Sequence, residues 1–494
     1  MLVMLHFMPM KKLDIGDRTF FDQIRTSTFE NPFGESRLAS DKSAVGMKGD
    51  ADQMDVLDQL LAVLASRLEK IAAGRIMDIR DYVADDRERL QIALLFHIFH
   101  NWRDRTDTYI RNQIDHGDEL LAWPGADALY REIQSHGIEP DYAAVCVAVF
   151  FQFRRAFYFI DTSLRGESPS MRRLREELWN AIFTCDTRLY VEKLWSRMED
   201  FSTLLLGETG TGKGAAAMAL GRSGYIPYVP ERRTFQESFT KAFIPINLSQ
   251  FAENLIESEL FGHRKGAFTG AIENHEGVFA RCSPCGAIFL DEIGDVSEQI
   301  QIKLLQVLQQ RTFSPVGGHE TLRFSGRVIA ATNQDLAARR GDGRFRNDFF
   351  YRLSSGTIEL PTLRRRIDER PEELDLLVAD IVARLAGTPD NALAERIVAA
   401  LRRDLPPGYV WPGNVRELEQ AAKSVLLTGH YAGDPCAVTG NDDDGARRVL
   451  AGNMSLEELN RWYCRRLYGR LGSYGPVAAR LGVDWRTVKK LVLA

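Results

Sequence analysis

The sequence has little cysteine, no excess of positive charge and no apolar run long enough to span a membrane. Its six cysteines are scattered over 494 residues, which is too few for a disulfide framework and favours a reducing compartment. The formal net charge is -5, so any nucleic-acid contact must come from a local basic patch. The most apolar run, 143–151, ends at Gln152, well short of the ~20 residues that a membrane helix needs. We therefore expect a cytoplasmic protein with no membrane contact.

The length of 494 residues predicts about three domains, and a hydrophobic content of 45% with 27% charged residues is that of an ordinary globular protein. Residues 1 to about 50 contain glycine and proline among polar residues, which predicts loose structure. From Asp55 onwards apolar residues recur at helical spacing, so the first ~195 residues are expected to form a mostly helical domain. It shows no receiver-type phosphoacceptor pattern. Sensing a ligand, binding a protein and oligomerisation all stay open as its role.

Three side-chain groups have two interpretations each. His97 and His100 could form a metal pair on a helix, but core or surface histidines are favoured because no further ligands stand nearby. The aromatic residues of 150–159 could line a ligand pocket, although core packing is favoured. Cys282 and Cys285 form a CxxC pair that could be redox-active or half of a metal site, although a turn that holds two cysteines is favoured.

A phosphate-binding motif begins where strands start to alternate with helices. The apolar strand 202–206 runs into a GxxxxGK loop that opens a helix over 215–220, which is the context of a P-loop. The glycines turn backbone N–H groups towards phosphate oxygens, and Lys213 adds a positive charge. Position 214 is Gly, where a general P-loop has Ser or Thr to bind magnesium. The predicted cofactor-binding residues of this loop are Gly207, Glu208, Thr209, Gly210, Thr211, Gly212, Lys213 and Gly214.

Two further strand ends complete the predicted nucleotide site. A buried strand over 288–290 delivers Asp291 and Glu292, and the strand 327–331 ends near Asn333. Asp291 would hold magnesium, directly or through water; Glu292 would polarise the attacking water, and the Asn333 amide could orient it. Several arginines in 344–352 predict contacts with an anion, such as a neighbouring subunit's γ-phosphate. The expected cofactors are ATP and Mg²⁺.

A short loop, Gly-Ala-Phe-Thr-Gly-Ala at 266–271, lies in the sequence between the P-loop and the acids Asp291 and Glu292. Glycine on both sides favours a mobile turn over a helix or strand. Phe268 and Thr269 at its centre are therefore expected to contact a partner and not the core.

The C-terminal residues predict a helix-turn-helix, with a generic helical hairpin as the alternative. Ser455 and Glu458 form a capping box that opens a helix. In 476–491, Ala478 lets two helices cross closely and Gly482 permits the sharp turn between them. The second helix carries side chains that suit phosphates and base edges in the major groove of double-stranded DNA, namely Arg486, Thr487, Lys489 and Lys490.

In this order and spacing, the motifs resemble the AAA+ domain of sigma-54-dependent transcriptional activators, the bacterial enhancer-binding proteins. The resemblance covers about 200–430 and includes 253–263, the intact loop 266–271, 289–295 and 411–418. The C-terminus separately resembles the Fis-type DNA-binding domain. The implied fold is an α/β P-loop AAA+ ATPase with a parallel sheet and a helical lid, beside a mostly α-helical N-terminal domain and a C-terminal helix-turn-helix. The expected domains are a helical regulatory domain of unknown type at 1–195, the sigma-54 interaction ATPase domain at 196–430 with its lid at about 365–430, a linker at 431–454 and the DNA-binding domain at 455–494.

The resemblance implies an ATP-dependent activator that binds an upstream enhancer site in DNA. Hydrolysis in a homo-oligomer, from dimer to hexameric ring, would drive the loop 266–271 against sigma-54 in RNA polymerase holoenzyme and remodel the closed complex. Phe268 and Thr269 would contact sigma-54. Asn333 would be sensor I and Asn247 would hold the catalytic glutamate in a switch. The remaining residues that the resemblance implies are the trans-acting arginine fingers Arg346 and Arg352 and the sensor II residue Arg416, beside the acids Asp291 and Glu292.

Two alternatives stay open. Another AAA+ remodelling motor, such as an unfoldase, would have no need of this Phe-Thr loop. The second alternative is a DNA-bound regulator that binds ATP without hydrolysing it. It would follow if Gly214, where family members commonly carry Glu, abolishes hydrolysis.

Residues 223–236 are an insertion relative to the family. They contain two prolines and two arginines and are expected to form a surface excursion, a loop that leaves the site intact.

Overall fold

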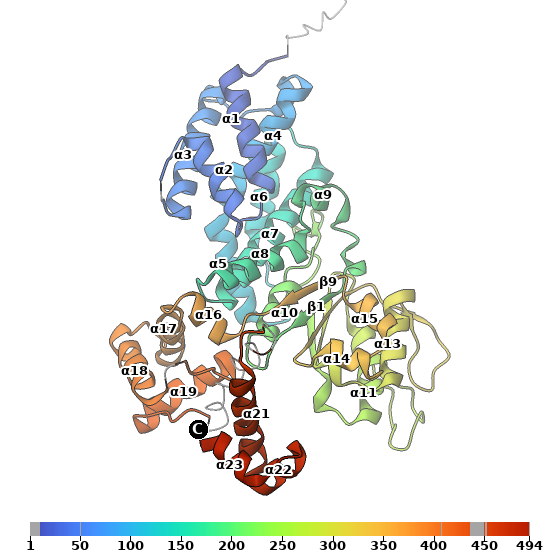
Figure 1. Ribbon diagram of the computed structural model, residues 1–494. Coiled ribbons are helices and arrows are strands. Elements are labelled where there is room, and N and C mark those ends of the chain that lie inside the picture. The colour runs from blue at the N-terminus through green and yellow to red at the C-terminus, as the bar shows by residue number, and fades with distance from the viewer. Residues whose placement is uncertain (1–9, 50, 407, 435–448, 450–451, 494) are drawn as a thin grey trace, which may run out of the picture. The chain divides into compact units, whose positions relative to one another are not determined.

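The structure is a computed structural model that describes residues 10–49, 51–406, 408–434, 449 and 452–493 (Figure 1). The chain divides into two compact units, Met1–Glu373 and Leu374–Ala494, and each is described by itself.

Helices make up the first part of the larger unit. They bury the apolar residues that recur at helical spacing, and Val56, Leu60 and Leu64 of α3 are completely buried. Asp14 and Asp52 cap α1 and α3 by accepting a hydrogen bond from a backbone N–H in the first turn. The helices of this part are α1 (Ile15–Phe29), α2 (Glu35–Val45), α3 (Gln53–Ala72), η1 (Ile79–Asp81), α4 (Ala84–Asn101), α5 (Arg103–His116), α6 (Pro124–Ser135), α7 (Pro140–Ser163), α8 (Pro169–Phe183), α9 (Thr187–Leu189), η2 (Tyr190–Leu194) and η3 (Met198–Asp200).

The loose structure expected before residue 50 is wrong, because α1 and α2 occupy most of it. Phe20, Phe21 and Ile24 of α1 are buried in the helical core. Arg18 donates to Asp86 of α4 at 2.8 Å, which joins α1 to that helix. The glycine and proline counted in the prediction belong to the turns between helices, and the apolar face of α1 was overlooked.

A five-stranded parallel sheet forms the rest of the larger unit, in the order β4-β5-β8-β1-β9. In a parallel sheet the carboxyl ends of all strands lie at one edge, where ligands bind. The strand β1 lies between β8 and β9, and Leu206 pairs with Thr332 on one side and Glu359 on the other. The predicted parallel sheet is confirmed. Its strands are β1 (Thr203–Leu206), β4 (Phe243–Asn247), β5 (Ala287–Asp291), β8 (Arg327–Thr332) and β9 (Gly356–Glu359).

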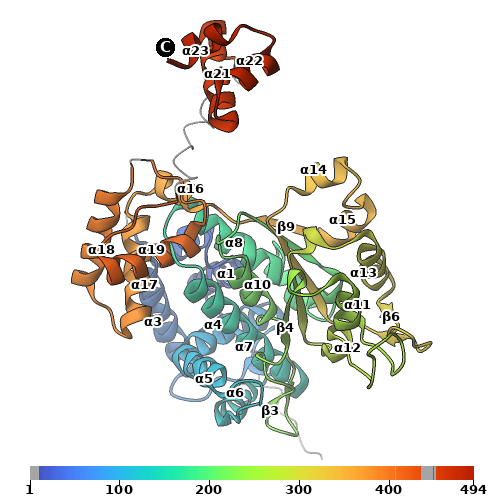
Figure 2. The same ribbon diagram turned by 90° about the horizontal axis from the view of Figure 1, so that it is seen from below.

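Alternate side chains of the strands face two separate apolar cores, as the period of a strand dictates. Leu205 and Ile329 belong to the core that also contains the N-terminal helices and α10 (Lys213–Gly221). Leu204 and Val328 belong to the second core. Figure 2 shows α7, α8 and α10 on one side of the sheet, and α11, α13 and α15 on the other. The remaining helices of this part are α11 (Glu253–Phe261), α12 (Val278–Arg281), α13 (Glu298–Gln310), α14 (Leu336–Gly341), α15 (Asn347–Leu353), α16 (Leu363–Glu369), η4 (Leu248–Gln250) and η5 (Ile293–Asp295).

The insertion at 223–236 is packed into the protein, so the expected surface excursion is wrong. Its strands β2 (Tyr228–Val229) and β3 (Thr234–Phe235) form a small antiparallel hairpin. The ring centroid of Phe235 lies 4.1 Å from that of Phe151 in α7, and the ring of Tyr228 lies 5.5 Å from that of Tyr130 in α6. Its exposed residues are those of the turn at 231–233 and Gln236 after β3. The prolines and arginines of the insertion suggested a surface loop, whereas its aromatic residues anchor the hairpin on the N-terminal helices.

Helix α7 is, within the part of the chain that the structure describes, the one helix long and apolar enough to cross a membrane by length and composition. The most apolar window of this helix has a mean hydropathy of 1.5, and 67% of that window is buried inside the protein. Such burial is typical of a core helix.

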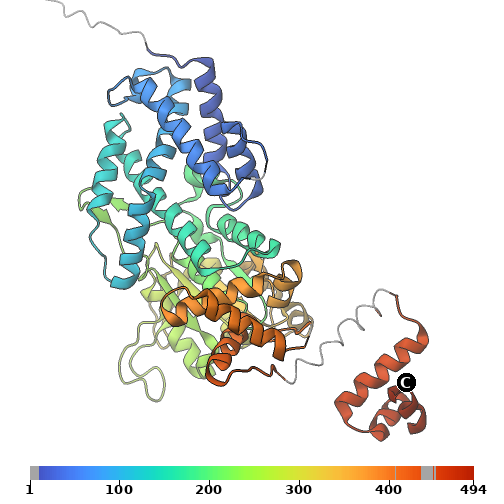
Figure 3. The ribbon, with the colours of Figure 1, turned by 90° about the vertical axis from the view of Figure 1, so that its left-hand side faces the viewer.

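The smaller unit contains only helices among its described residues. Three of them follow the unit boundary, namely α17 (Glu373–Ala386), α18 (Asn391–Asp404) and α19 (Asn414–Thr428). The capping box of Ser455 and Glu458 is confirmed at the start of α21. Val477, Ala478 and Val488 form a small core between α21 (Leu456–Leu471), α22 (Tyr474–Leu481) and α23 (Trp485–Leu493), which Figure 3 shows as a separate bundle. Most of the predicted linker, 435–448 and 450–451, lies outside the described residues.

Candidate nucleotide site and surface loop

The Gly-rich loop connects the carboxyl end of β1 to the start of α10. Gly210 and Gly212 have φ of 79° and 104°, which glycine adopts without strain. Lys213 Nζ donates to the carbonyl oxygens of Gly207 at 2.8 Å and Glu208 at 3.1 Å, so its charge lies over the loop. The N-terminus of α10 adds backbone N–H groups and the positive end of the helix dipole. The loop can therefore hold a phosphate group.

Glu292 and Asn333 are brought together with this loop. Asn333 Nδ2 donates to Thr209 Oγ1 at 2.9 Å, which joins the end of β8 to the loop. Burial and then the Asp291 carboxylate raise the pKa of Glu292, whereas Lys213 and a hydrogen bond from the Asn333 backbone lower it. Glu292 Oε2 is buried without a hydrogen-bond partner, and the residue has the left-handed φ of 56°. A carboxylate with a raised pKa and an unused oxygen is suited to accept a proton from water.

The acids fit a magnesium–nucleotide, because carboxylate oxygens are ligands that Mg²⁺ prefers. Asp291 ends β5 and Glu292 follows it directly. Gly214 contributes no ligand, and a Cβ built at this position would meet no atom within 4 Å. Nothing in the packing therefore requires glycine at position 214.

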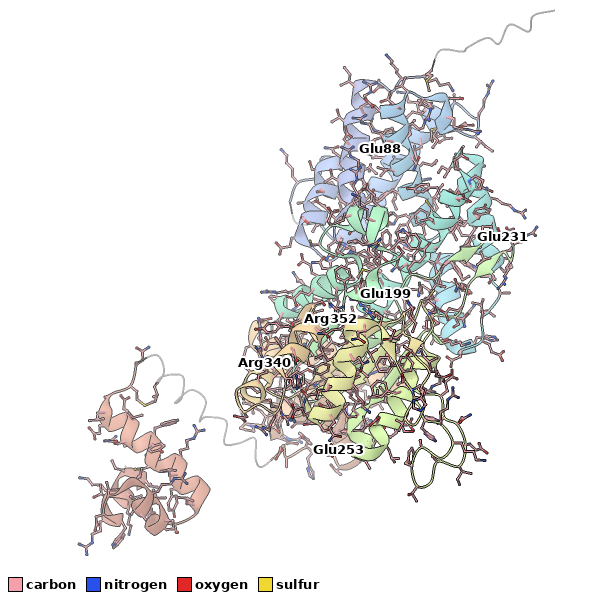
Figure 4. All side chains as sticks on the ribbon, turned by 90° about the vertical axis from the view of Figure 1, so that its right-hand side faces the viewer. Glu88, Glu199, Glu231, Glu253, Arg340 and Arg352 are labelled. Carbon is pink, nitrogen blue, oxygen red and sulfur yellow. The ribbon has the colours of Figure 1, made fainter. Side chains whose placement is uncertain are left out.

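Among the described residues, the side chains of the other predicted catalytic residues make no hydrogen bond to Glu292, Asn333 or the P-loop. Asn247 is next to Asp291 in the register of β4 and β5, but its side-chain oxygen accepts from Ser249 N at 3.0 Å and Ser249 Oγ at 2.7 Å. Arg352, labelled in Figure 4, donates to the Leu308 carbonyl of α13 at 2.9 Å.

Arg346 lies at the N-terminus of α15 and pairs with Glu298 at 3.0 Å and Asp348 at 2.8 Å. The predicted sensor II residue, Arg416, belongs to the smaller unit and is exposed on α19.

Two sets of residues at the site were not found from the sequence. Arg364 of α16 pairs with Glu208 of the loop. The run of three arginines at 364–366 was the available signal. Further along, Arg366 forms a buried ion pair with Glu373 at 2.8 Å, and Glu373 accepts from the backbone N–H of Glu167 at 2.8 Å. These contacts join α16 to the segment before α8.

The second set holds the far end of the P-loop helix. Arg155 of α7 is completely buried and donates to the carbonyl oxygens of Arg222 and Gly224, both at 2.7 Å. Gln152, one turn earlier, donates to the Ser223 carbonyl at 2.9 Å. Burial lowers the pKa of Arg155 to about 9. Polar residues inside the most apolar helix of the chain were the available signal, because a buried charge needs partners.

The loop 266–271 forms a tight turn at the surface. Gly266 N donates to the Ala271 carbonyl at 2.8 Å, and Gly266 and Gly270 have φ of 82° and 103°. The Phe268 side chain is 38% exposed, with its ring centroid 4.9 Å from that of His263. Thr269 is exposed. An apolar ring held at the surface is available to a partner.

A second hairpin supports this loop. Its strands are β6 (Thr312–Phe313) and β7 (Leu322–Arg323). Arg264 pairs with Glu320 in the turn of the hairpin. A Cβ at Gly317 would lie 2.7 Å from Ala267 Cβ, so the two loops touch.

The basic residues of α23 are exposed. Lys489 and Lys490 follow Arg486 by three and four residues, so each lies near Arg486 on the helix surface. Thr487 is also exposed, and Val488 between them is buried against α21 and α22.

The cysteine and histidine pairs give no metal site. Within the described residues no group of three or more His, Cys, Asp or Glu could hold a metal ion. Burial raises the pKa of both Cys282 and Cys285 to about 12, so both are protonated thiols, and both are free. Ser283 accepts a hydrogen bond from Gly286 N at 2.9 Å, which fits the turn interpretation.

Comparisons with known proteins agree with this arrangement. Residues 188–359 match the family model of the sigma-54 interaction domain. The transcriptional regulatory protein ZraR of Klebsiella oxytoca is 42% identical over 329 residues, which cover 65% of this chain and 67% of that protein. The response regulator protein PilR of Pseudomonas aeruginosa is 36% identical over 340 residues, covering 67% and 69%. The Nif-specific regulatory protein of Azotobacter vinelandii is 35% identical over 302 residues, covering 59% of this chain and 49% of that protein.

Among solved structures, NtrX from Brucella abortus in complex with ADP aligns at a TM-score of 0.40 with 21% identity, covering 74% of this chain and 80% of that one. ZraR and PilR are more than 30% identical to this chain over about two thirds of their own length, and the family model of the sigma-54 interaction domain covers the strands of the parallel sheet. These two findings establish the family. The chain has the P-loop AAA+ fold and belongs to the sigma-54-dependent transcriptional activators.

Proposed function

We propose that the protein hydrolyses ATP and uses the energy to remodel sigma-54 RNA polymerase closed complexes from an upstream DNA site. The observation that carries the proposal is the cluster of Glu292 and Asn333 on the P-loop, on the same unit as the exposed Phe268. Phe268 and Thr269 contact sigma-54 in this proposal, and the basic face of α23 binds double-stranded DNA.

The residues divide the work of hydrolysis. The loop N–H groups and Lys213 hold the phosphates, and Glu292 accepts the proton of the attacking water while Asn333 orients it. Magnesium, held by Asp291, would neutralise charge that develops on the phosphates.

The side chains of Arg346 and Arg352 contact α13 and α15 and form no hydrogen bond to the P-loop among the described residues, so their proposed action is on the nucleotide of a neighbouring subunit. The proposed assembly is accordingly a homo-oligomeric ring, with Arg416 contributing to the nucleotide site as sensor II.

The test separates the loop from the nucleotide site. In Phe268→Ala, ATP turnover should stay within about twofold of wild type, while open-complex formation at a sigma-54 promoter is lost. In Glu292→Ala, ATP binding should persist while turnover falls by about 100-fold or more. Phe201→Ala is the matched control, because its ring is also 38% exposed and lies elsewhere on the same unit. Wild-type levels of open complex in Phe268→Ala would contradict the proposal.

The second candidate is an ATP-binding regulator without hydrolysis, which the missing side chain at position 214 favours. Absence of ATP turnover in the wild type, together with tight ATP binding, would establish it.

A further inference from the structure

A cavity of 660 Å³ lies inside the N-terminal helices, away from the residues of the nucleotide site and of the surface loop. Sites for small organic molecules are typically about 300 to 1,000 Å³. Its walls come from α1 to α5, α7, α8 and η2 and from the segments between them. Exposed residues such as Met54, Asp104 and Tyr142 belong to its wall, so the cavity is open to solvent and a small molecule can enter it.

Aromatic rings form much of the wall. Phe99 of α4 lies 5.3 Å from Phe150 and 6.2 Å from Phe153 of α7, between ring centroids, and Trp179 of α8 lies 5.8 Å from Phe153. The two interpretations of these aromatic residues, a ligand pocket and core packing, therefore each hold for some of the aromatic residues of α7. Some line the cavity, whereas Phe151 packs in the core against the hairpin.

The two buried arginines at the cavity are already neutralised. Arg37 pairs with Asp41 at 2.8 Å, and Arg154 pairs with Asp107 at 2.6 Å. An anionic ligand would therefore find no unpaired cation at these positions, and its desolvation would not be offset.

His100 and Trp179 offer unused hydrogen-bonding groups. Burial, and then the charge of Arg37, lower the pKa of His100 well below its usual value, so the ring is neutral. His100 lines the cavity and forms no side-chain hydrogen bond, and its Nδ1 is buried without a partner. Trp179 Nε1 is also buried without a partner. Buried polar atoms of this kind are rare unless a ligand or water completes them.

We propose that the cavity binds a small neutral molecule of one or two aromatic rings with a single hydroxyl or carbonyl group. The rings pack against Phe99, Phe150 and Phe153, and the polar group bonds to His100. The same helix that lines the cavity, α7, holds the end of the P-loop helix through Gln152 and Arg155. Occupancy therefore acts on ATP binding through α7, and this second part rests on the proposed nucleotide binding.

Calorimetric titration of the full chain with 2-naphthol, naphthalene and 2-naphthoate tests the site without nucleotide or sigma-54. Wild type should bind 2-naphthol saturably at one site per chain and 2-naphthoate at least about tenfold more weakly. His100→Phe keeps a ring of similar shape, so it should lower 2-naphthol affinity about fivefold, as for one hydrogen bond, and leave naphthalene affinity unchanged. His97→Phe is the matched control, since this half-buried histidine of the same helix is not part of the cavity wall.

Val145→Trp extends a large ring into the cavity and should abolish binding of all three probes, with an unchanged circular dichroism spectrum. No saturable binding of naphthalene or 2-naphthol by wild type, or undiminished binding by Val145→Trp, would overturn the site. Tighter binding of 2-naphthoate than of 2-naphthol would overturn the proposal that the ligand is neutral.

The coupling to ATP binding has a test of its own. Saturating 2-naphthol should change the affinity for a non-hydrolysable ATP analogue. By reciprocity, the analogue should change the affinity for 2-naphthol by the same factor. An unchanged analogue affinity in a protein that binds both would overturn the route through α7, whereas a protein that binds no analogue would fail the proposed function alone.

Discussion

Replacing Arg155 by Met tests whether α7 holds the P-loop helix. The substitution keeps most of the apolar length of the side chain but removes the donors to the Arg222 and Gly224 carbonyls. Each buried acceptor left without a donor costs about 1–3 kcal/mol. The guanidinium also lies 4.4 Å from the Phe151 ring centroid, a contact worth about 1 kcal/mol. Relief of the buried charge returns part of this cost, so we expect a net loss of about 3 kcal/mol.

Hydrogen exchange followed by mass spectrometry on peptides that cover 213–226 measures the effect where it arises. In Arg155→Met these amides should exchange about 100-fold faster, which corresponds to about 3 kcal/mol. Arg154→Met is the matched control: the neighbouring arginine bonds to Asp107 within the N-terminal helices, so its loss should speed exchange in α5 and α7 but not in α10. Equal exchange at 213–226 in wild type and Arg155→Met would refute the reasoning.

Three further predictions follow from single residues. Burial and Asp291 raise the pKa of Glu292 above its usual 4.5, so the charged carboxylate is disfavoured in the folded protein. Ionisation of Glu292 therefore lowers the stability of the protein at pH values above the folded-state pKa. Below the unfolded-state pKa the carboxyl is protonated in both states, and this loss of stability disappears. Without nucleotide, Glu292→Gln should therefore unfold at a higher temperature than wild type at pH 8, with the difference vanishing near pH 4; a constant difference in thermal scans would contradict the cause given. Gly214→Ala should stabilise the protein in urea by up to about 1 kcal/mol, since the position is helical and open, and a loss of stability would show that the Cβ meets something. Lys490→Ala should weaken DNA binding and reduce the slope of log affinity against log salt by about 1, while Glu457→Ala on α21 leaves both unchanged; an unaltered slope for Lys490→Ala would exclude a phosphate contact.

The nucleotide site was predictable because its chemistry lies at strand ends that the sequence marks directly. Glycine at 210 and 212 is required by positive φ, and Asp291 and Asn333 follow runs of buried apolar residues. In a parallel sheet these ends must meet, so the cluster followed from the order of the motifs alone.

The features that the sequence did not predict depend on contacts between distant segments. The bond from Arg155 to Gly224 joins residues 69 positions apart, and the cavity wall collects residues from eight helices. Phe150 and Phe151 are adjacent in the sequence, yet one lines the cavity and the other packs in the core. Helical spacing shows that a face is apolar, but it does not show whether that face packs against other side chains or lines a pocket. The sequence therefore could not distinguish core packing from a pocket for the aromatic residues of 150–159.

The most direct test of the account is the binding of sigma-54 to the protein held with a transition-state analogue of ATP. We predict a stable complex that forms only with the analogue, is lost in Phe268→Ala, and persists in Phe201→Ala, whose ring is equally exposed. Absence of any complex in wild type that demonstrably binds the analogue, or equal binding by Phe268→Ala, would contradict it.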